Sequence, residues 1–216
     1  MKFFTKKRVV LFLLFIFPLI CFLLLSTGKN NFTKLPVITT NVTDVSEIDE
    51  TNQFKLVDHV SVICFLGNDV DKNKAGLFNL NEKIYKEFTK NKKFQIIAVF
   101  PQGKESDAQK LKKELGAFTD MKNWHFLSAS KKNIESFYAS FSVDEPLTDL
   151  SSTKAFLVDK GLSLRGRIGE EENIFGYDMN SVAELKNKLK DDIKVVYYEY
   201  YAAFKERNEN NAKRKI

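Results

Sequence analysis

Cysteine and histidine are scarce in this sequence. Its 216 residues contain two cysteines and two histidines. Cys21 lies in a long apolar run and Cys64 in a predicted strand far along the chain, so we expect no disulfide bond within the chain. No Cys-x-x-Cys or Cys-x-x-x-Cys pair occurs. His59 and His125 each lack a second ligand nearby in the sequence, so we interpret both as structural or surface residues.

Recognisable enzyme signatures are also missing. We find no glycine-rich phosphate loop, no Ser-His-Asp order and no paired-carboxylate motif. Asp69, Asp71 and Asn73 have the spacing of the first calcium-loop ligands, but Lys74 and Leu80 stand where that loop needs glycine and glutamate. We therefore predict no enzyme activity and no bound cofactor.

A long apolar run occurs only near the N-terminus. Residues 9–25 are uninterruptedly apolar apart from Pro18, and Lys2, Lys6, Lys7 and Arg8 precede them. The run is at the short end of the lengths that span a bilayer, and the residues near its end suit neither signal-peptide cleavage nor lipidation of Cys21. We predict an uncleaved signal anchor that forms a single transmembrane helix in a bacterial inner membrane. The positive-inside rule then puts the N-terminus in the cytoplasm and the remaining domain in the periplasm.

The net charge does not indicate a nucleic-acid partner. The chain carries a formal charge of +6 from 34 basic and 28 acidic side chains. Four of the basic residues flank the apolar run, which leaves 30 basic against 28 acidic residues, or +2, in the rest. Further basic residues lie in the tail at 208–216. The basic character therefore reflects the N-terminal flank and this tail and not a nucleic-acid-binding face.

Beyond the flank and anchor at 1–28, we divide the chain into a tether at 29–53, a domain at 54–207 and the basic tail. The tether is rich in Thr, Asn and Asp without sustained periodicity. Strand and helix patterns alternate in the domain. Strands are predicted over 60–66, 94–100, 124–127, 155–158 and 162–168, and helices beginning near Ser106, Ser130 and Ser181. This order predicts an α/β fold, a mixed sheet with helices on its faces.

The stretches "IIAVFPQGKESDAQKLKKELGAF", "NWHFLSASKKNIESFYASFSV" and "STKAFLVDKGLSL" resemble the SCO/SenC family. Members of that family are membrane-anchored copper proteins with a thioredoxin-like fold that help to assemble cytochrome c oxidase. The resemblance covers roughly residues 55–168 and rests on element order and short local motifs. It implies a thioredoxin-like domain behind a membrane anchor, with protein partners among respiratory oxidase assembly components.

The family's copper ligands are not present at the positions that the resemblance implies. The family binds copper through a Cys-x-x-x-Cys pair and a histidine, and soft ligands of this kind select Cu(I). Here the matching positions are near Asp69, Asn73 and Ser151, and Phe100 stands where the family has an acidic residue. We therefore predict a non-catalytic protein that acts through protein–protein contacts. The alternative is a thiol or metal-binding redox protein that uses Cys64.

Two segments are candidates for partner binding. The first is a strand and loop that contains Arg165, Arg167, Glu170, Glu171 and Glu172, for which internal salt pairing is the competing interpretation. The second is the last helix, where Tyr198 and Tyr201 lie beside the apolar stripe. Exposed tyrosine is enriched in protein interfaces.

Overall fold

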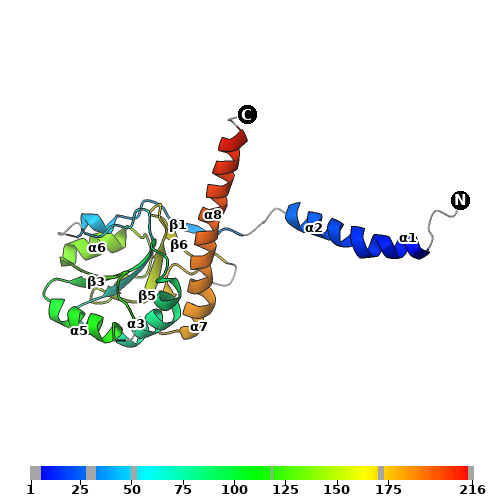
Figure 1. Ribbon diagram of the computed structural model, residues 1–216. Helices are drawn as coiled ribbons and strands as arrows, with labels where there is room; N and C mark the ends of the chain where they lie inside the picture. Colours follow the sequence, from blue (N-terminus) through cyan, green and yellow to red (C-terminus); the bar gives the residue numbers. More distant parts are fainter. Residues whose placement is uncertain (1–5, 28–32, 50–52, 118, 170–172, 214–216) are drawn as a thin grey trace. The chain divides into compact units, whose positions relative to one another are not determined.

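The computed structural model describes residues 6–27, 33–49, 53–117, 119–169 and 173–213. The chain divides into two units, residues 1–33 and residues 34–216. Figure 1 shows the larger unit as a sheet with helices packed on both of its faces. The N-terminal unit is helical and is described here by itself.

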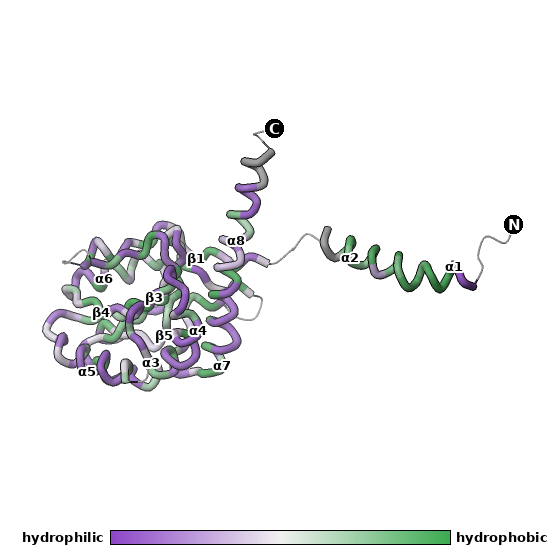
Figure 2. The backbone as a smooth tube through the Cα atoms, in the orientation of Figure 1, coloured by the Kyte–Doolittle hydropathy of each residue, from purple (hydrophilic) through white to green (hydrophobic). Residues whose placement is uncertain are grey.

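The N-terminal unit contains three helical segments in succession, α1 (Lys6–Leu11), η1 (Phe12–Ile16) and α2 (Phe17–Thr27). Most of this unit is strongly hydrophobic (Figure 2). The wide turns of η1 divide the apolar run into shorter helices. Among the described residues, no helix combines the length and the apolar character that crossing a membrane requires. The predicted transmembrane helix is therefore not confirmed.

The larger unit is built on a mixed sheet of seven strands within the described residues. The main path runs β1-β6-β5-β2-β3-β4, and β7 also pairs with β5. The parallel pairs are β2 with β3 and β3 with β4, and the others are antiparallel. The strands are β1 (Val37–Thr39), β2 (Val60–Leu66), β3 (Phe94–Pro101), β4 (Trp124–Ala129), β5 (Ser151–Val158), β6 (Leu164–Arg165) and β7 (Tyr177–Asp178).

Side chains of β2 alternate between two cores because successive residues of a strand point to opposite faces. Val62 and Cys64 face one core, whereas Ile63 and Phe65 face the other. All seven residues of β2 are buried, which confirms the predicted central strand. Its length matches the apolar run at 60–66, in which only Ser61 is polar, as expected for a strand covered on both faces.

Helices cover both faces of the sheet. The core that contains Cys64 is closed by helices following β2 and β3 and by the last helix, while the opposite core is closed by one helix and by residues 42–49 and 53–56. The short helix η2 (Val45–Glu47) lies in that N-terminal segment. The other helices are α3 (Lys74–Leu80), η3 (Asn81–Tyr85), α4 (Lys86–Phe88), α5 (Glu105–Leu115), α6 (Lys131–Ala139), α7 (Val182–Glu184), η4 (Leu185–Leu189) and α8 (Lys190–Lys213).

Two of the three predicted helix starts are confirmed. The side chains of Ser130 and Ser181 each accept a hydrogen bond from a backbone N–H in the first turn of the helix that they precede. Ser106 does not cap α5, which begins at Glu105 after Lys104. Acidic residues in the first turn, where the helix dipole favours negative charge, suit that position without a side-chain cap.

The predicted tether at 29–53 is corrected, because described residues from Leu35 onward pack into the domain. Val42, Val45 and Ile48 are buried in the second core. The carboxylate of Asp44 accepts hydrogen bonds from the backbone N–H groups of Leu56 and of two nearby residues, at 3.0 to 3.1 Å. These long-range bonds hold a segment that has no periodic pattern of its own.

Candidate functional site

The candidate site lies at the carboxyl end of β2, where the loop that follows this strand meets the loop that precedes β5. Gly67 has φ of +74° at this point. A Cβ atom on Gly67 would lie 2.5 Å from Cβ of Ser151 and 2.6 Å from the carbonyl oxygen of Asp149. Both the positive φ and the close approach therefore require glycine.

Asn73 and Ser151 meet here, although 78 positions separate them in the sequence. The Asn73 Nδ2 atom donates to the hydroxyl oxygen of Ser151 at 2.8 Å and to the carbonyl oxygen of Ser152 at 2.9 Å. Asn73 and Ser151 are both buried. A buried amide costs free energy unless it is paired, and these two bonds satisfy its donors.

The resemblance placed copper ligands at these positions, and the structure brings two of the three together. The resemblance placed the family's second thiolate near Asn73 and its imidazole near Ser151. Asp69 is exposed, and its backbone carbonyl accepts a hydrogen bond from the N–H of Lys72. An amide and a hydroxyl group are hard donors that do not suit Cu(I). In the part of the chain that the structure describes, no group of three metal-ligating side chains gathers.

Cys64 is fully buried in β2, opposite Ala98 of β3 and Ala155 of β5. Burial raises the pKa of its thiol far above the ordinary value, because desolvation disfavours the thiolate. Only the thiolate is an effective nucleophile or metal ligand. The geometry therefore disfavours the alternative function built on Cys64.

Thiol labelling measures this burial directly. In the full chain with Cys21→Ser, Cys64 should not react with a maleimide in native buffer during the time in which the denatured chain is labelled completely. The reason is that the thiol is neither exposed nor ionised. Labelling at similar rates in native and denatured protein would contradict the prediction.

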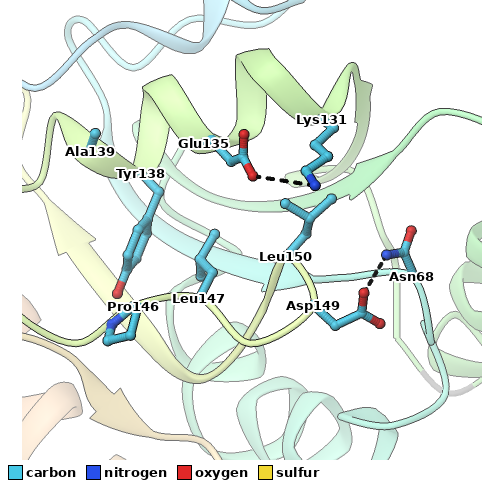
Figure 3. Close-up of a pocket in the computed structure, with 9 residues that line it drawn as sticks. All are labelled: Asn68, Lys131, Glu135, Tyr138, Ala139, Pro146, Leu147, Asp149 and Leu150. Carbon is cyan, nitrogen blue, oxygen red and sulfur yellow. Dashed lines mark hydrogen bonds and ion pairs between the residues drawn. The ribbon is translucent and has the colours of Figure 1, made fainter.

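A pocket of about 450 Å³ opens beside this site, between α6 and the loop before β5 (Figure 3). The loop contributes an apolar part, and α6 contributes polar side chains at the rim. Lys131 and Glu135 form an ion pair there at 3.8 Å. The lining residues are Asn68, Lys131, Glu135, Tyr138, Ala139, Pro146, Leu147, Asp149 and Leu150.

The wall formed by the loop is held in an uncommon backbone conformation. Asp149 and Leu150 have φ of 53° and 60°, in the left-handed region that costs non-glycine residues free energy. The surrounding contacts enforce this shape. Asn68 donates its side-chain amide to the Asp149 carboxylate at 2.6 Å, and Thr148 and Ser151 exchange backbone hydrogen bonds.

Tyr138 forms one wall of the pocket, and its hydroxyl group donates to the backbone carbonyl of Glu145. Burial, with a smaller effect of the Glu145 charge, raises the pKa of Tyr138 to about 12. Its phenol therefore stays protonated at neutral pH and keeps donating to the loop. A neutral aromatic wall and two leucines beside charged groups suit a protein segment that carries an apolar side chain.

The predicted partner-binding residues differ in their exposure and in the contacts that they make. Arg165 is buried and bound within the domain, so its assignment as a contact residue is corrected. Arg167 pairs with Asp192 at 2.8 Å, as the salt-pairing interpretation expected. Glu170, Glu171 and Glu172 lie outside the described residues. Tyr198 and Tyr201 are exposed on α8, and their role in partner binding stays a prediction.

Sequence reasoning missed the pocket. The segment "SVDEPLTDL" at 142–150 gave a loop signal but no sign of a cavity. Leu147 and Leu150 interrupt this polar segment, which was the available clue. The cavity itself depends on the distance between the loop and α6, which a local pattern does not report.

His125 lies on β4 and stacks on the ring of Phe54, with 4.4 Å between the ring centroids. Its pKa is lowered from 6.5 to about 4, mainly because burial disfavours the charged imidazolium and secondarily because of the nearby charge of Lys112. The ring is therefore neutral in the folded protein near pH 6. It is a packing residue in this structure.

Acidification should destabilise the fold through His125. Between pH 6.5 and about pH 4 the unfolded state binds a proton at this ring that the folded state does not, so the free energy of unfolding falls as the pH falls. Because the ring keeps some contact with water, we expect the loss to be at most about 2 kcal/mol. Denaturant titrations across this pH range should show a smaller loss for His125→Gln than for the unmodified chain. An unchanged loss in His125→Gln would contradict the assignment.

Comparison with known proteins shows a likeness in structure to several solved proteins. No protein-family model matches the sequence, and no curated protein matches it. Among solved structures, the chain is similar to BsSco, a member of the Sco family of cytochrome c oxidase assembly proteins. That likeness has a TM-score of 0.50 and 16% identity over 76% of this chain and 98% of the other.

Two further similar structures have lower scores. Apo Sco1 from Thermus thermophilus has a TM-score of 0.45 and 12% identity over 78% of this chain and 95% of its own. The thioredoxin domain of a thiol-disulfide oxidoreductase from Bacteroides vulgatus has a TM-score of 0.41 and 17% identity over 76% and 98%. At these identities a likeness shows the fold alone. The likeness to BsSco, together with the observed mixed sheet, identifies the fold of this chain as thioredoxin-like.

Proposed function

We propose that this chain is a membrane-anchored, non-catalytic thioredoxin-like protein that binds a segment of a partner protein in the pocket between α6 and the loop at 146–150. The carrying observation is the buried hydrogen bond between Asn73 and Ser151 beside that pocket. It joins hard donors where copper chemistry needs soft ones. The cavity next to it remains open and combines apolar walls with a charged rim.

The anchor in this proposal is the apolar run at 9–25, behind its basic flank. Three helical segments follow one another across this run without an intervening loop. The proposed location is a bacterial inner membrane, with the N-terminus in the cytoplasm and the domain in the periplasm.

The proposed partners are components of cytochrome c oxidase assembly. Support comes from the resemblance of residues 55–168 to the SCO/SenC family and from the likeness in fold to BsSco. Fold alone does not determine function, so this step is an analogy. It calls for a test in cells.

Complementation of a deletion strain tests the proposal, with cytochrome c oxidase activity of isolated membranes as the readout. Cys64→Ala should restore activity as well as the unmodified chain, because no step uses the thiol. Leu147→Lys should fail, because a lysine there puts a charge on the apolar wall of the pocket. The matched control is Val57→Lys, a similar change at an exposed valine before the opposite end of β2, and it should restore activity.

Immunoblots of the membranes must show equal amounts of each variant. Loss of activity with Cys64→Ala at normal abundance would indicate thiol chemistry and overturn the non-catalytic proposal. Full activity with Leu147→Lys would overturn the assignment of the pocket. An oxidase that is unaffected by the deletion would remove the oxidase link.

A further inference from the structure

The last helix, α8, has a packed part and a projecting part. Ile193 and Val196 are fully buried in the core, and the ring of Tyr200 lies 3.8 Å from the ammonium nitrogen of Lys160. Beyond this point the side chains of Tyr201 and Phe204 are 66% and 63% exposed. The final turns of α8 extend past the sheet of this unit (Figure 1). Packing against the sheet therefore does not account for these two aromatic residues.

The exposed aromatic residues share one side of the helix with basic residues. Tyr201 and Phe204 are three positions apart, and Lys205 is four positions from Tyr201, so all three are neighbours on the helix surface. Residues 201–216 contain five basic and two acidic side chains, a formal charge of +3. Aromatic rings beside lysine and arginine are typical of segments at the boundary between a bilayer and water.

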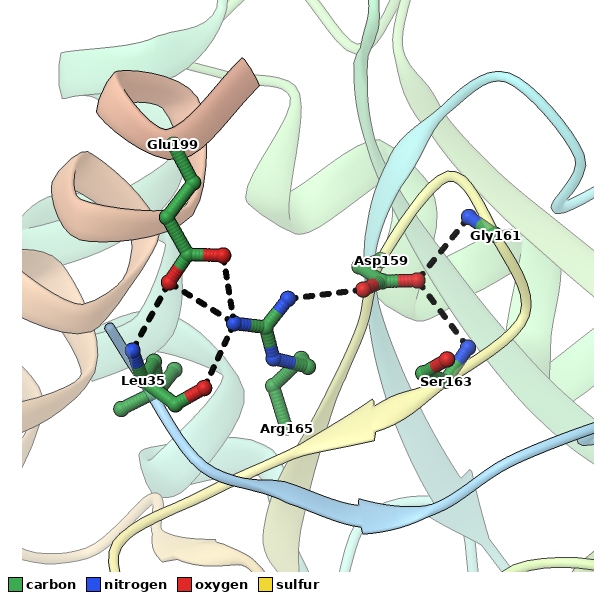
Figure 4. A network of polar contacts seen from close by, with 6 residues as sticks. All are labelled: Leu35, Asp159, Gly161, Ser163, Arg165 and Glu199. Carbon is green, nitrogen blue, oxygen red and sulfur yellow. Dashed lines mark hydrogen bonds and ion pairs between the residues drawn. The ribbon is translucent and has the colours of Figure 1, made fainter. Parts of the chain in front are cut away.

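The chain enters the domain next to this part of α8 (Figure 4). The backbone N–H of Leu35 donates to the carboxylate of Glu199 at 2.7 Å, and the backbone carbonyl of Leu35 accepts from Arg165 at 2.6 Å. Residue 35 is therefore fixed to α8 one turn or less before Tyr201.

The short connection limits how far this entry point lies from the apolar run. Seven residues, 28–34, join the end of α2 to Leu35. Fully extended, the eight Cα–Cα steps from Thr27 to Leu35 span at most about 29 Å. Phe204 lies five residues beyond Glu199, or about 7.5 Å along the helix. If residues 9–25 cross a bilayer, a connection of this length permits the projecting part of α8 to reach its headgroups.

We propose that residues 201–208 of α8 lie on the headgroup layer of the anchoring membrane, with Tyr201 and Phe204 at the hydrocarbon boundary and the basic side chains on anionic headgroups. This proposal rests on the anchor in the proposed function. It assigns to Tyr201 a contact with lipid in place of the predicted contact with protein. A lipid contact would also fix the orientation of the domain at the membrane surface.

Quenching of an introduced indole by brominated lipids tests this contact. The full chain carrying Phe204→Trp is reconstituted into vesicles of phosphatidylglycerol and phosphatidylcholine with brominated acyl chains. The matched control is Lys132→Trp, at an exposed position on α6. Fluorescence of the native Trp124, which is buried in the domain, is subtracted with the unmodified chain. We expect loss of fluorescence for Phe204→Trp and little loss for Lys132→Trp.

The charge contribution is tested in the same vesicles. Adding Arg207→Glu to Phe204→Trp should reduce quenching, as should high salt, because both weaken attraction to anionic headgroups. Quenching of Phe204→Trp no greater than that of Lys132→Trp, in chains that sediment with the vesicles, would overturn the headgroup contact and leave the anchor intact. Failure of the chain to sediment with vesicles would overturn the anchor and this proposal with it.

Discussion

Replacing Arg165 by methionine should lower the free energy of unfolding by about 3–5 kcal/mol, because it leaves buried charges without a counter-ion. The guanidinium group of Arg165 bonds to Asp159 at 2.8 Å and to both carboxylate oxygens of Glu199 at 2.7 and 2.8 Å. All three side chains are largely buried. Without the arginine, two carboxylates and the Leu35 carbonyl would have to be re-solvated or left unpaired.

Chemical denaturation of the full chain in detergent measures this loss. Arg167→Met is the matched control, since Arg167 also pairs with a carboxylate of α8 but its side chain is 38% exposed. We expect a smaller loss there, because only one buried carboxylate loses its counter-ion and Asp192 keeps a hydrogen bond from the Tyr177 hydroxyl group. Adding Glu199→Gln to Arg165→Met should recover part of the stability by removing one unpaired charge. Equal losses for Arg165→Met and Arg167→Met would contradict this assignment.

The same network fastens the N-terminal segment to α8, which provides a local readout. Arg165→Met should make the peptide bond between Lys34 and Leu35 more sensitive to trypsin, because it removes the bond that holds the Leu35 carbonyl. Arg167→Met should leave this bond protected. Unchanged protection in Arg165→Met would show that other contacts hold the segment.

The sequence predicted those helices and strands that depend on residues close together in the chain. The apolar run at 60–66, which only Ser61 interrupts, predicted β2 with its observed bounds, because burial on both faces favours apolar residues on both sides of a strand. Ser130 and Ser181 predicted two helix starts through their side-chain oxygens. The predicted strands at 155–158 and 162–168 correspond to β5 and to the shorter β6, which pair antiparallel.

Features that depend on distant partners were not predictable in the same way. Residues 35–49 and 53–56 have no periodic pattern, and their place is set by hydrogen bonds to the Asp44 carboxylate and to the Leu35 carbonyl. The sequence placed Arg165 and Arg167 in one predicted strand, but it did not show that both side chains reach α8. The contact between Asn73 and Ser151 likewise arises only when two loops converge at the end of the sheet.

Introducing soft ligands at the candidate site should create a copper site. The variant with Asp69→Cys, Asn73→Cys and Ser151→His is expected to bind Cu(I) stoichiometrically. The side chains at 73 and 151 already converge within hydrogen-bonding distance, and the resemblance places the remaining thiolate at 69. Two thiolates and an imidazole provide the soft donors that Cu(I) prefers.

Competition with a chromogenic Cu(I) chelator measures this gain. The matched control carries Ser151→His with Asp69→Ser and Asn73→Ser, so it keeps the imidazole and lacks the thiolates. We expect the chelator to retain the copper in that control. A folded triple variant that binds copper no better than this control would contradict the correspondence of positions on which the candidate site rests.

The same titration of the unmodified full chain tests the central claim most directly. The candidate site contains the buried hydrogen bond between Asn73 and Ser151, and Cys64 is a buried, protonated thiol. We predict that the chelator keeps all of the Cu(I) and that the chain competes no better than Cys64→Ala. Tight, stoichiometric binding that disappears in Cys64→Ala would contradict the account and establish a metal-binding function through this thiol.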